Sequence, residues 1–534
     1  MNFATIDYVI FAAYAGLILS VGLWVSRKGE KTSEDYFLAS KSLPWWAIGA
    51  SLIAANISAE QFIGMSGSGF ASGLAIASYE WMAALTLLIV GKYFLPIFIE
   101  KGLYTIPEFV EKRYSTQLKT ILAIFWIGLY VFVNLSSVLY LGALALQTIM
   151  GIPMGYGVMG LALFAAAYSL YGGLSAVAWT DVVQVVFLVL GGLFTTYLAL
   201  NALSDGAGML AGFNQVLEAV PDRFHMILDE SNPEYTNLPG VWVLIGGLWV
   251  ANLYYWGFNQ YIIQRTLAAK SLAEAQKGIA LAAGLKMIIP FIVVIPGIAA
   301  YVMVNDPAIM ARIGDIAQNN VPSLAQADKA YPWLLQLLPA GFKGVAFAAL
   351  AAAVVSSLAS MLNSTSTIFT MDIYKEYINK NASETKMVTV GRLTAAIALV
   401  VACIMAPLLG GIDQAFQFIQ KYTGMVSPGI LAVFMLGLFW KKTTNKGAVW
   451  GAILSIVITL CFNLFTTLPF LHQMGLAFLL SCGVIAGISY MDGNGEDDAK
   501  GIPLTKNLFD TDATFNISAF AVCIALVVFY ALLW

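Results

Sequence analysis

NISAEQFIGMSGSG, residues 56–69, interrupts an apolar run with amide, carboxyl and hydroxyl side chains and with three glycines. An apolar run of about 20 residues predicts a helix that crosses a hydrocarbon core about 30 Å thick. Asn56 and Glu60 are four residues apart and share one face of that helix, with Gln61 beside them. Because polar groups are costly in hydrocarbon and glycine weakens a helix, the stretch predicts a discontinuous membrane helix with a functional role.

A second stretch of the same kind is ANLYYWGFNQ, residues 251–260, which follows Gly246 and Gly247. The two stretches lie in the second and seventh predicted spans, five places apart in the order of spans, so their helices run in opposite directions. Discontinuous helices at matching positions of two inverted halves indicate the midplane binding site of a transporter. The residues leave open the alternative of a tightly packed Gly/Ser interface between helices.

The composition extends this prediction to the whole chain. Of the 534 residues, 60% are hydrophobic and 11% are charged, whereas soluble domains carry roughly 25% charged residues. We therefore predict an all-α integral membrane protein with about fourteen transmembrane helices. The expected spans are 6–26, 44–70, 74–99, 118–150, 154–171, 178–203, 239–264, 277–304, 333–373, 387–408, 413–439, 446–466, 469–490 and 514–534.

The distribution of Lys and Arg between successive loops supports this number of spans. One alternate set of loops holds twenty cations and the other holds three, Arg223, Arg312 and Lys329. Loops rich in Lys and Arg stay in the cytoplasm, so we expect both termini outside. The twenty cytoplasmic cations are Arg27, Lys28, Lys31, Lys41, Lys101, Lys112, Arg113, Lys119, Arg265, Lys270, Lys277, Lys375, Lys380, Lys386, Arg392, Lys441, Lys442, Lys446, Lys500 and Lys506.

Further polar residues lie inside the predicted spans. Glu80, Lys286 and Gln420 would place a carboxylate, an ammonium and an amide around one cavity. Such a set suits a ligand dense in hydroxyls, because each hydroxyl both donates and accepts a hydrogen bond. Tyr254, Tyr255 and Trp256 could offer flat apolar faces to a sugar ring. A Glu80–Lys286 ion pair that only locks the helix bundle is the alternative.

A cation site is predicted in the ninth span, where Ala353, Ser356 and Ser357 share one helix face. Hydroxyls, together with carbonyls freed by an unwound helix, can supply the oxygen ligands of a sodium ion. Serines in membrane helices also bond to carbonyls of their own helix, which is the alternative. Asp181, near the start of the sixth span, could relay a cation or could cap its helix.

Two further motifs are YSLYGGLSA at 168–176 and GLFWKK at 437–442, the second followed by KGA at 446–448 and by Gly451. These motifs resemble the sodium/solute symporter family, in particular its sodium/glucose branch. The resemblance covers nearly the whole chain and implies a leucine-transporter-like core of two inverted five-helix repeats with discontinuous first helices. The implied organisation is an extra helix and loop (1–43), repeat 1 (44–203), an outside loop (204–238), repeat 2 (239–439) and three extra helices (440–534).

The resemblance also implies roles for individual residues. A substrate site would comprise Asn56, Gln61, Glu80, Asn252, Tyr255, Lys286 and Gln420. An inner gate would use Tyr255 supported by Asn134, and an outer gate would use Met65, Tyr79 and Phe416. Sodium would bind carbonyls of Ala54, Ile57 and Ala353 with hydroxyls of Ser356 and Ser357, and Asp181 would assist its release. Ala83 departs from the hydroxyl residue expected in galactose symporters.

The expected function is sodium-coupled uptake of galactose or glucose by alternating access across a bacterial inner membrane. Other polar solutes of such symporters, an inositol, sialic acid or an amino acid, are the alternative. Sodium is the expected co-transported ion, with no organic cofactor, and the expected partners are the sugar and the lipid bilayer, for a monomer or weak homodimer. The net charge of −3 argues against nucleic acid. HExxH and GxSxG motifs are absent, so no enzyme is expected.

Overall fold

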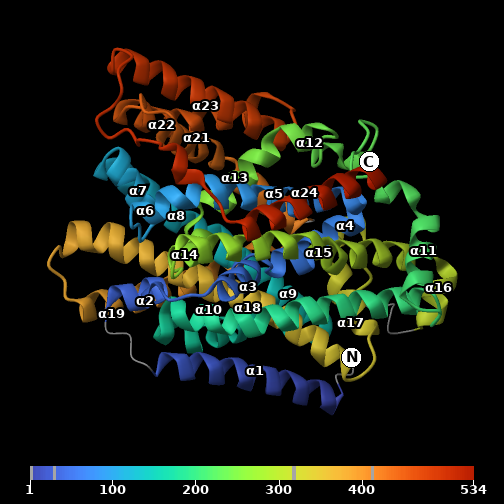
Figure 1. The fold of residues 1–534 in the computed structure, drawn as a ribbon. Helices are drawn as coiled ribbons and strands as arrows, with labels where there is room; N and C mark the ends of the chain where they lie inside the picture. The colour runs from blue at the N-terminus through green and yellow to red at the C-terminus, as the bar shows by residue number, and fades with distance from the viewer. Residues whose placement is uncertain (1–3, 28–31, 315–319, 411–413) are drawn as a thin grey trace.

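The computed structural model describes residues 4–27, 32–314, 320–410 and 414–534, and it is helical throughout these ranges (Figure 1). A single isolated bridge between Leu43 and Ala269 is the only β pairing in that part of the chain. Lys28 and Lys31, two of the predicted cytoplasmic cations, lie outside the described residues. The predicted all-α class is confirmed.

Ten of the described helices are long and apolar enough to cross a membrane. An eleventh span results if α20 (Ala415–Gly424) and α21 (Ser427–Phe439), which meet at a bend of 50°, are taken together. The ten are Thr5–Ser26 (α1), Glu60–Glu100, Thr116–Met150, Gly172–Leu203, Leu272–Asn305 (α15), Phe342–Ile378, Glu384–Leu409, Asn445–Phe465 (α22), Phe470–Asp492 (α23) and Ala513–Leu533 (α24).

Glycines with positive φ divide two of the long helical stretches. Gly73, at φ +79°, separates α4 (Ser66–Ser72) from the segment that leads into α5 (Ser78–Ile89). A Cβ on Gly73 would lie 2.4 Å from the carbonyl oxygen of Arg223, so no other residue fits there without movement. The helical stretch 60–100 therefore contains the predicted boundary between the spans 44–70 and 74–99.

Gly173 acts in the same way within α10 (Met154–Leu203), whose backbone leaves the helical conformation there at φ +51° and ψ −151°. This region of backbone space is essentially restricted to glycine. A Cβ on Gly173 would lie 2.3 Å from the carbonyl oxygen of Tyr36. The glycine pair of the YSLYGGLSA motif thus bends α10 between the predicted spans 154–171 and 178–203. The missing side chain of Gly173 leaves room for the backbone of Tyr36.

Both helices that were predicted to be discontinuous are broken. After α3 (Trp45–Asn56) the backbone leaves the helical region at Ile57, with φ −79° and ψ +89°, and a π-helical turn η2 (Glu60–Met65) follows. In the second half, Asn259 is extended at φ −88° and ψ +116° between α13 (Gly247–Phe258) and α14 (Gln260–Leu267). These breaks interrupt the predicted spans 44–70 and 239–264, so neither is counted among the ten helices as one uninterrupted span.

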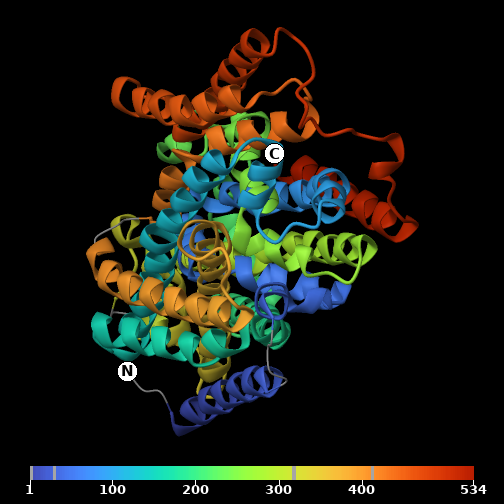
Figure 2. The same ribbon diagram turned by 90° about the vertical axis from the view of Figure 1, so that its left-hand side faces the viewer.

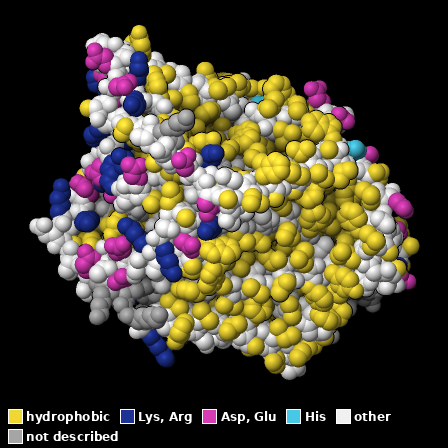
Figure 3. All heavy atoms as spheres, viewed as in Figure 1, with side chains coloured by type: hydrophobic (Ala, Val, Ile, Leu, Met, Phe, Trp, Pro, Cys, Tyr) yellow, Lys and Arg dark blue, Asp and Glu magenta, His cyan; other side chains and the backbone are white. Residues whose placement is uncertain are grey.

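The helices form one bundle, with α1 at one edge and the pair α22 and α23 at the opposite edge, and Figure 2 shows the same arrangement from the side. Hydrophobic side chains cover a broad belt of the surface in Figure 3. Lys and Arg gather at one end of this belt, over the ends of α7 (Ile106–Arg113), α2 (Ser33–Leu38) and α19 (Glu384–Met405). Both α1 and α24 have their terminal ends toward the opposite side.

Three of the predicted loop cations are buried rather than solvated. Arg265 lies within α14 and is 0% exposed, while Arg113 and Lys119 are 2% and 3% exposed. Arg113 donates to the carbonyl oxygens of Gly437 and Thr443 at 3.0 and 2.9 Å, at the end of α21. Each of these three cations of the basic loops therefore has partners on other helices.

Candidate functional site

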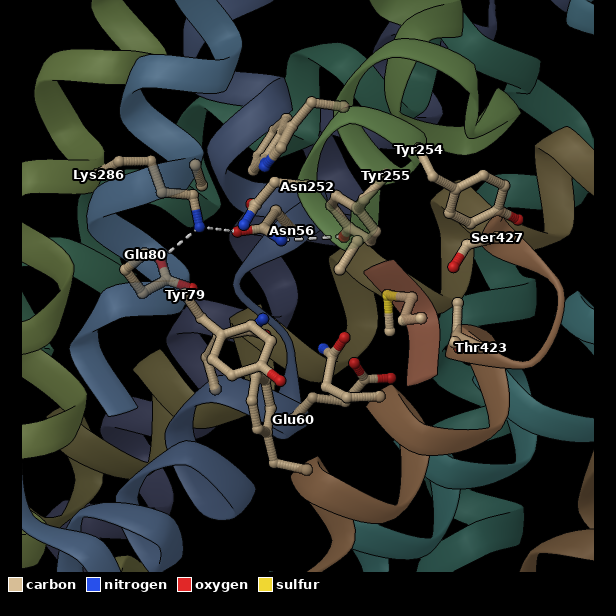
Figure 4. Close-up of a pocket in the computed structure, with 18 residues that line it drawn as sticks. Asn56, Glu60, Tyr79, Glu80, Asn252, Tyr254, Tyr255, Lys286, Thr423 and Ser427 are labelled. Carbon is tan, nitrogen blue, oxygen red and sulfur yellow. Dashed lines mark hydrogen bonds and ion pairs between the residues drawn. The ribbon is translucent and has the colours of Figure 1, made fainter. Parts of the chain in front are cut away.

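A cavity of about 50 Å³ lies between the two broken helices. Figure 4 shows side chains from several helices converging on it. All seven residues predicted for the substrate site line it: Asn56, Gln61, Glu80, Asn252, Tyr255, Lys286 and Gln420. Two predicted outer-gate residues, Tyr79 and Phe416, line it as well.

The electrostatic centre of the cavity is a buried ion pair. Lys286 of α15 pairs with Glu80 of α5 and also donates a hydrogen bond to the side-chain oxygen of Asn56 (Figure 4). The ammonium of Lys286 also lies 5.1 Å from the centre of the Trp256 ring, a cation–π contact. Three helices that are far apart in the sequence are therefore joined at this one cation.

The Tyr255 hydroxyl continues this hydrogen-bonded series. It accepts a hydrogen bond from Nδ2 of Asn56 at 2.9 Å and lies 2.5 Å from the hydroxyl of Tyr261. Tyr255 thus links the cavity to α14, beyond the second break. Asn134, predicted to support Tyr255, lies in η5 (Leu129–Leu135), and its buried side-chain oxygen has no hydrogen-bond partner in this structure.

The three predicted outer-gate residues are buried: Met65 is 0%, Tyr79 6% and Phe416 1% exposed. The rings of Tyr79 and Phe416 meet edge to face, with centroids 5.1 Å apart. The turn η2 lies close to α20 at Gly64, since a Cβ on Gly64 would lie 3.0 Å from Cβ of Phe416. An aromatic layer therefore closes this side of the cavity.

A polar layer from the 204–238 loop contacts helices beyond the aromatic residues. Arg223 donates to the carbonyl oxygens of Phe70 and Ala71 at 2.6 and 2.9 Å. Glu234 accepts from the Ser72 hydroxyl at 3.3 Å and from the Gln414 amide at 3.3 Å. The loop thereby connects α4 with the start of α20.

The predicted sodium ligands lie where α3 ends beside α18 (Phe342–Ile368). In an unbroken helix the amide of Ser58 would donate to the Ala54 carbonyl. Here it donates instead to the backbone carbonyl oxygen of Asn56 at 2.9 Å and to the side-chain oxygen of Gln61 at 3.0 Å. The amide of Gln61 donates to the Ser58 carbonyl rather than to that of Ile57. The break thus diverts the expected helical donors of the Ala54 and Ile57 carbonyls.

The serines of α18 bond mainly across helices. The Ser357 hydroxyl donates to the Ala55 carbonyl at 2.9 Å, and the Ser356 hydroxyl donates to the Asp181 carboxylate at 2.5 Å. Ser360 does bond to the carbonyl four residues back in its own helix. The alternative of bonding within one helix therefore holds for Ser360 but not for Ser356 and Ser357.

Asp181 is fully buried within α10 and does not cap it. Its carboxylate accepts from the hydroxyls of Ser51 and Ser356, both at 2.5 Å, and lies 3.5 Å from the guanidinium of Arg265. Arg265 donates in turn to Ser51 at 2.7 Å and to Ser360. Sequence analysis missed Arg265, because its position after an apolar run matched a loop cation.

Other residues that line the cavity were not assigned to the substrate site from the sequence, among them Glu60, Thr423, Ser427 and Met474. For Glu60 a signal existed, since it shares a helix face with Asn56. Thr423, Ser427 and Met474 come from α20, α21 and α23, and no pattern in the sequence brings these helices to the cavity. The described residues contain no group of three or more His, Cys, Asp or Glu side chains placed to hold a metal ion.

A polar cavity enclosed in an apolar helix bundle, with broken helices beside it, defines a solute transporter of the membrane. The chain belongs to the Sodium:solute symporter family, whose profile matches residues 36–455. This membership confirms the family resemblance of the two sequence motifs and the expectation that the chain is not an enzyme.

Individual relatives cover most of the chain. The "Sodium/glucose cotransporter" of Vibrio parahaemolyticus is 66% identical over 99% of this chain and 98% of its own. The human "Sodium/myo-inositol cotransporter 2" is 35% identical over 85% of this chain and 69% of its own. The solved structure of a Na⁺-coupled sialic acid symporter superposes with a TM-score of 0.80 at 24% identity, covering 92% of this chain and 98% of that chain. The last likeness shows a shared fold.

Proposed function

We propose that the protein imports a hexose, glucose or galactose, by symport with sodium. The cavity carries this proposal, because it surrounds the space with amides, a carboxylate and an ammonium beside aromatic faces. Sugar hydroxyls both donate and accept hydrogen bonds, so they match such a mixed lining. The relative named as a sodium/glucose cotransporter, at 66% identity over almost the full length, supports the same substrate class and ion.

The proposed architecture has fourteen spans with a leucine-transporter-like core. Residues 44–203 and 239–439 would form the two inverted repeats, with 1–43, the loop 204–238 and 440–534 outside them. The matched breaks at Ile57 and Asn259 support this division, since each lies in the first helix of a proposed repeat. The basic cluster at one end of the molecule supports a cytoplasmic face there and both termini outside.

The sodium ion would bind between α3 and α18. Carbonyls of Ala54, Ile57 and Ala353 and hydroxyls of Ser356 and Ser357 would be its ligands. The diverted amide of Ser58 supports this assignment, because it leaves carbonyl oxygen available at the break. Asp181, bonded to Ser356, would receive the ion on release toward the cytoplasm.

Transport would proceed by alternating access. Sodium would hold the end of α3 against α18, which fixes Asn56 and so the position of Tyr255. The sugar would stack on Tyr255 and bond to Gln61, Glu80, Asn252, Lys286 and Gln420. Rearrangement of Tyr255 would open the inner side, while Met65, Tyr79 and Phe416 close the outer side. The protein would work in a bacterial inner membrane as a monomer or weak homodimer.

The choice between the two hexoses and a second candidate solute depend on different observations. Ala83 lines the cavity without a hydroxyl, which weakens the case for galactose over glucose. Relatives named as sodium/myo-inositol cotransporters share 34–35% identity with this chain, so an inositol is the second candidate.

Uptake into proteoliposomes tests the proposed function. Radiolabelled glucose, galactose and myo-inositol are offered with an inward sodium gradient, and with choline in place of sodium as the control. We expect one or both hexoses to accumulate above the external concentration only with sodium. Accumulation of myo-inositol alone would replace the substrate, and equal uptake in choline would contradict sodium coupling.

A further inference from the structure

Glu60 is a buried carboxylate that faces the cavity with an oxygen left without a partner. The residue is 7% exposed, lines the cavity, and its Oε1 accepts no hydrogen bond in this structure. Burying a carboxylate without donors is strongly unfavourable. A donor is therefore expected from outside the chain in at least one state of the transport cycle.

Neither charge of the Lys286–Glu80 pair provides a free hydrogen-bond donor for Glu60. Lys286 bonds to Glu80 and Asn56 and lies over the Trp256 ring, so this ammonium is already paired with another carboxylate. In Figure 4 the Glu60 side chain lies apart from the Lys286–Glu80 pair. Among the charged residues that line the cavity, two carboxylates thus face one ammonium, and Glu60 is the one that is not paired.

The neighbouring Gln61 is held differently, although it was the predicted sugar ligand. Its side-chain oxygen accepts from the amide and the hydroxyl of Ser58, at 3.0 and 3.2 Å, and so stabilises the break in the helix. The amide of Glu60 donates to the Ser58 hydroxyl at 3.0 Å, which fixes the backbone of Glu60 at the first turn after the break. The break therefore uses the oxygen of Gln61, whereas the buried Oε1 of Glu60 has no partner in this structure.

We propose that Glu60 accepts a hydrogen bond from a hydroxyl of the bound sugar and is a specificity-determining residue of the cavity. This inference rests on the proposed sugar transport. A carboxylate only accepts hydrogen bonds, so Glu60 recognises a hydroxyl that donates at one position of the sugar ring. A sugar that lacks that hydroxyl leaves the carboxylate unsatisfied and is discriminated against by the cavity.

The test is a cycle that combines the Glu60→Gln substitution with removal of single hydroxyls from glucose. Competition by each monodeoxyglucose against radiolabelled glucose is measured at saturating sodium, on the full chain in lipid nanodiscs. In the wild type, removing the recognised hydroxyl weakens binding by about 10- to 100-fold, the range expected for a hydrogen bond to a charged group. In E60Q this loss becomes about 5- to 10-fold smaller, because a neutral amide accepts more weakly.

Glu218→Gln is the matched control, since Glu218 is an exposed carboxylate of the outside loop. The loss of affinity on removal of each hydroxyl should be the same in E218Q as in the wild type. The thermal unfolding midpoint and a Glu60→Asp variant, which keeps the charge, separate loss of recognition from misfolding. E60D should retain a larger penalty at the recognised hydroxyl than E60Q.

Three outcomes would overturn the inference. Identical penalties at every hydroxyl in wild type and E60Q would remove Glu60 from sugar recognition while leaving sugar transport intact. Loss of one bound sodium ion per protein in E60Q, measured with ²²Na⁺, would assign the carboxylate to a cation instead. A wild type that binds no hexose would overturn the proposed function together with this inference.

Discussion

The Lys286–Glu80 pair could be read either as part of a binding site or as a lock on the helix bundle. In the structure the pair lines the cavity and also joins helices, because Lys286 bonds to Asn56, and Asn56 donates to the Tyr255 hydroxyl. A buried ion pair is costly to form but more costly to break, since the remaining charge has no counter-ion. A ligand that shares hydrogen bonds with this pair would therefore act on the position of Tyr255.

Replacing Lys286 by Met should destabilise the protein by about 3–5 kcal/mol, because Glu80 is left as an unpaired buried charge. Adding Glu80→Gln to the same chain should restore most of this stability, while sugar uptake stays abolished in both variants. Thermal unfolding and proteoliposome uptake measure the two effects. A double variant as unstable as the single one would contradict the pairing.

Replacing Tyr255 by Phe removes the hydroxyl that joins Asn56 to Tyr261 and keeps the ring. We expect slower sodium-driven sugar uptake with unchanged sodium binding, because the predicted sodium ligands do not include this side chain. Uptake and ²²Na⁺ binding are measured together, with the exposed Tyr422→Phe as control. Wild-type uptake in Y255F would exclude a role of this hydroxyl in gating.

At the scale of helices, breaks in the backbone leave carbonyl groups without their helical donors, and glycines lie where two segments are in close contact. Gly437 of the GLFWKK motif illustrates the second use, since a Cβ there would lie 2.5 Å from the Tyr114 hydroxyl. That hydroxyl donates to the Val433 carbonyl at 2.8 Å, and Arg113 beside it donates to carbonyls at the end of α21. The motif is therefore a docking surface for the segment that ends α7.

Replacing Gly173 by Ala should destabilise the protein by more than about 1–3 kcal/mol, the cost of a non-glycine residue in such a backbone conformation. The added contact with the Tyr36 carbonyl increases the loss. Gly160→Ala, in the same helix α10 and with open space around it, should leave stability almost unchanged or raise it. Thermal unfolding of both variants in detergent checks the difference, and an equal response would contradict the argument.

At the scale of the molecule, the proposed cavity and cation site share α3, which ends between them. Asn56 faces the cavity, while the carbonyl of Ala55 accepts a hydrogen bond from Ser357 on α18. Ligands at the two proposed sites would therefore act on the same break in the backbone. Such an arrangement would couple the two binding equilibria, because each ligand would favour the geometry that the other requires.

Sodium should raise the affinity for the sugar, and the sugar should raise the affinity for sodium by the same factor. Coupling energies of this kind typically correspond to about 5- to 150-fold changes in affinity. Equilibrium binding of labelled glucose at low and saturating sodium, and of ²²Na⁺ with and without glucose, gives both factors. Affinities that do not respond to the other ligand would contradict coupled transport.

The sequence by itself determined the helical membrane class, the distribution of basic loops and the stretches where helices break. It also picked out the seven cavity residues from the polar groups in its spans and from the family resemblance. The span boundaries and breaks follow from local properties, because the length of an apolar run and the cost of a polar group inside it depend on neighbouring residues.

Only the tertiary structure decided which polar groups are bonded and which remain open. Arg265 reads as a loop cation until α14 packs beside Asp181, and Gln61 resembles a free ligand until its oxygen bonds to Ser58 at the break. The buried Oε1 of Glu60 has no partner. Partners such as Ser356 and Asp181 are 175 residues apart, and no local pattern encodes which of many possible partners the packing brings within hydrogen-bond distance.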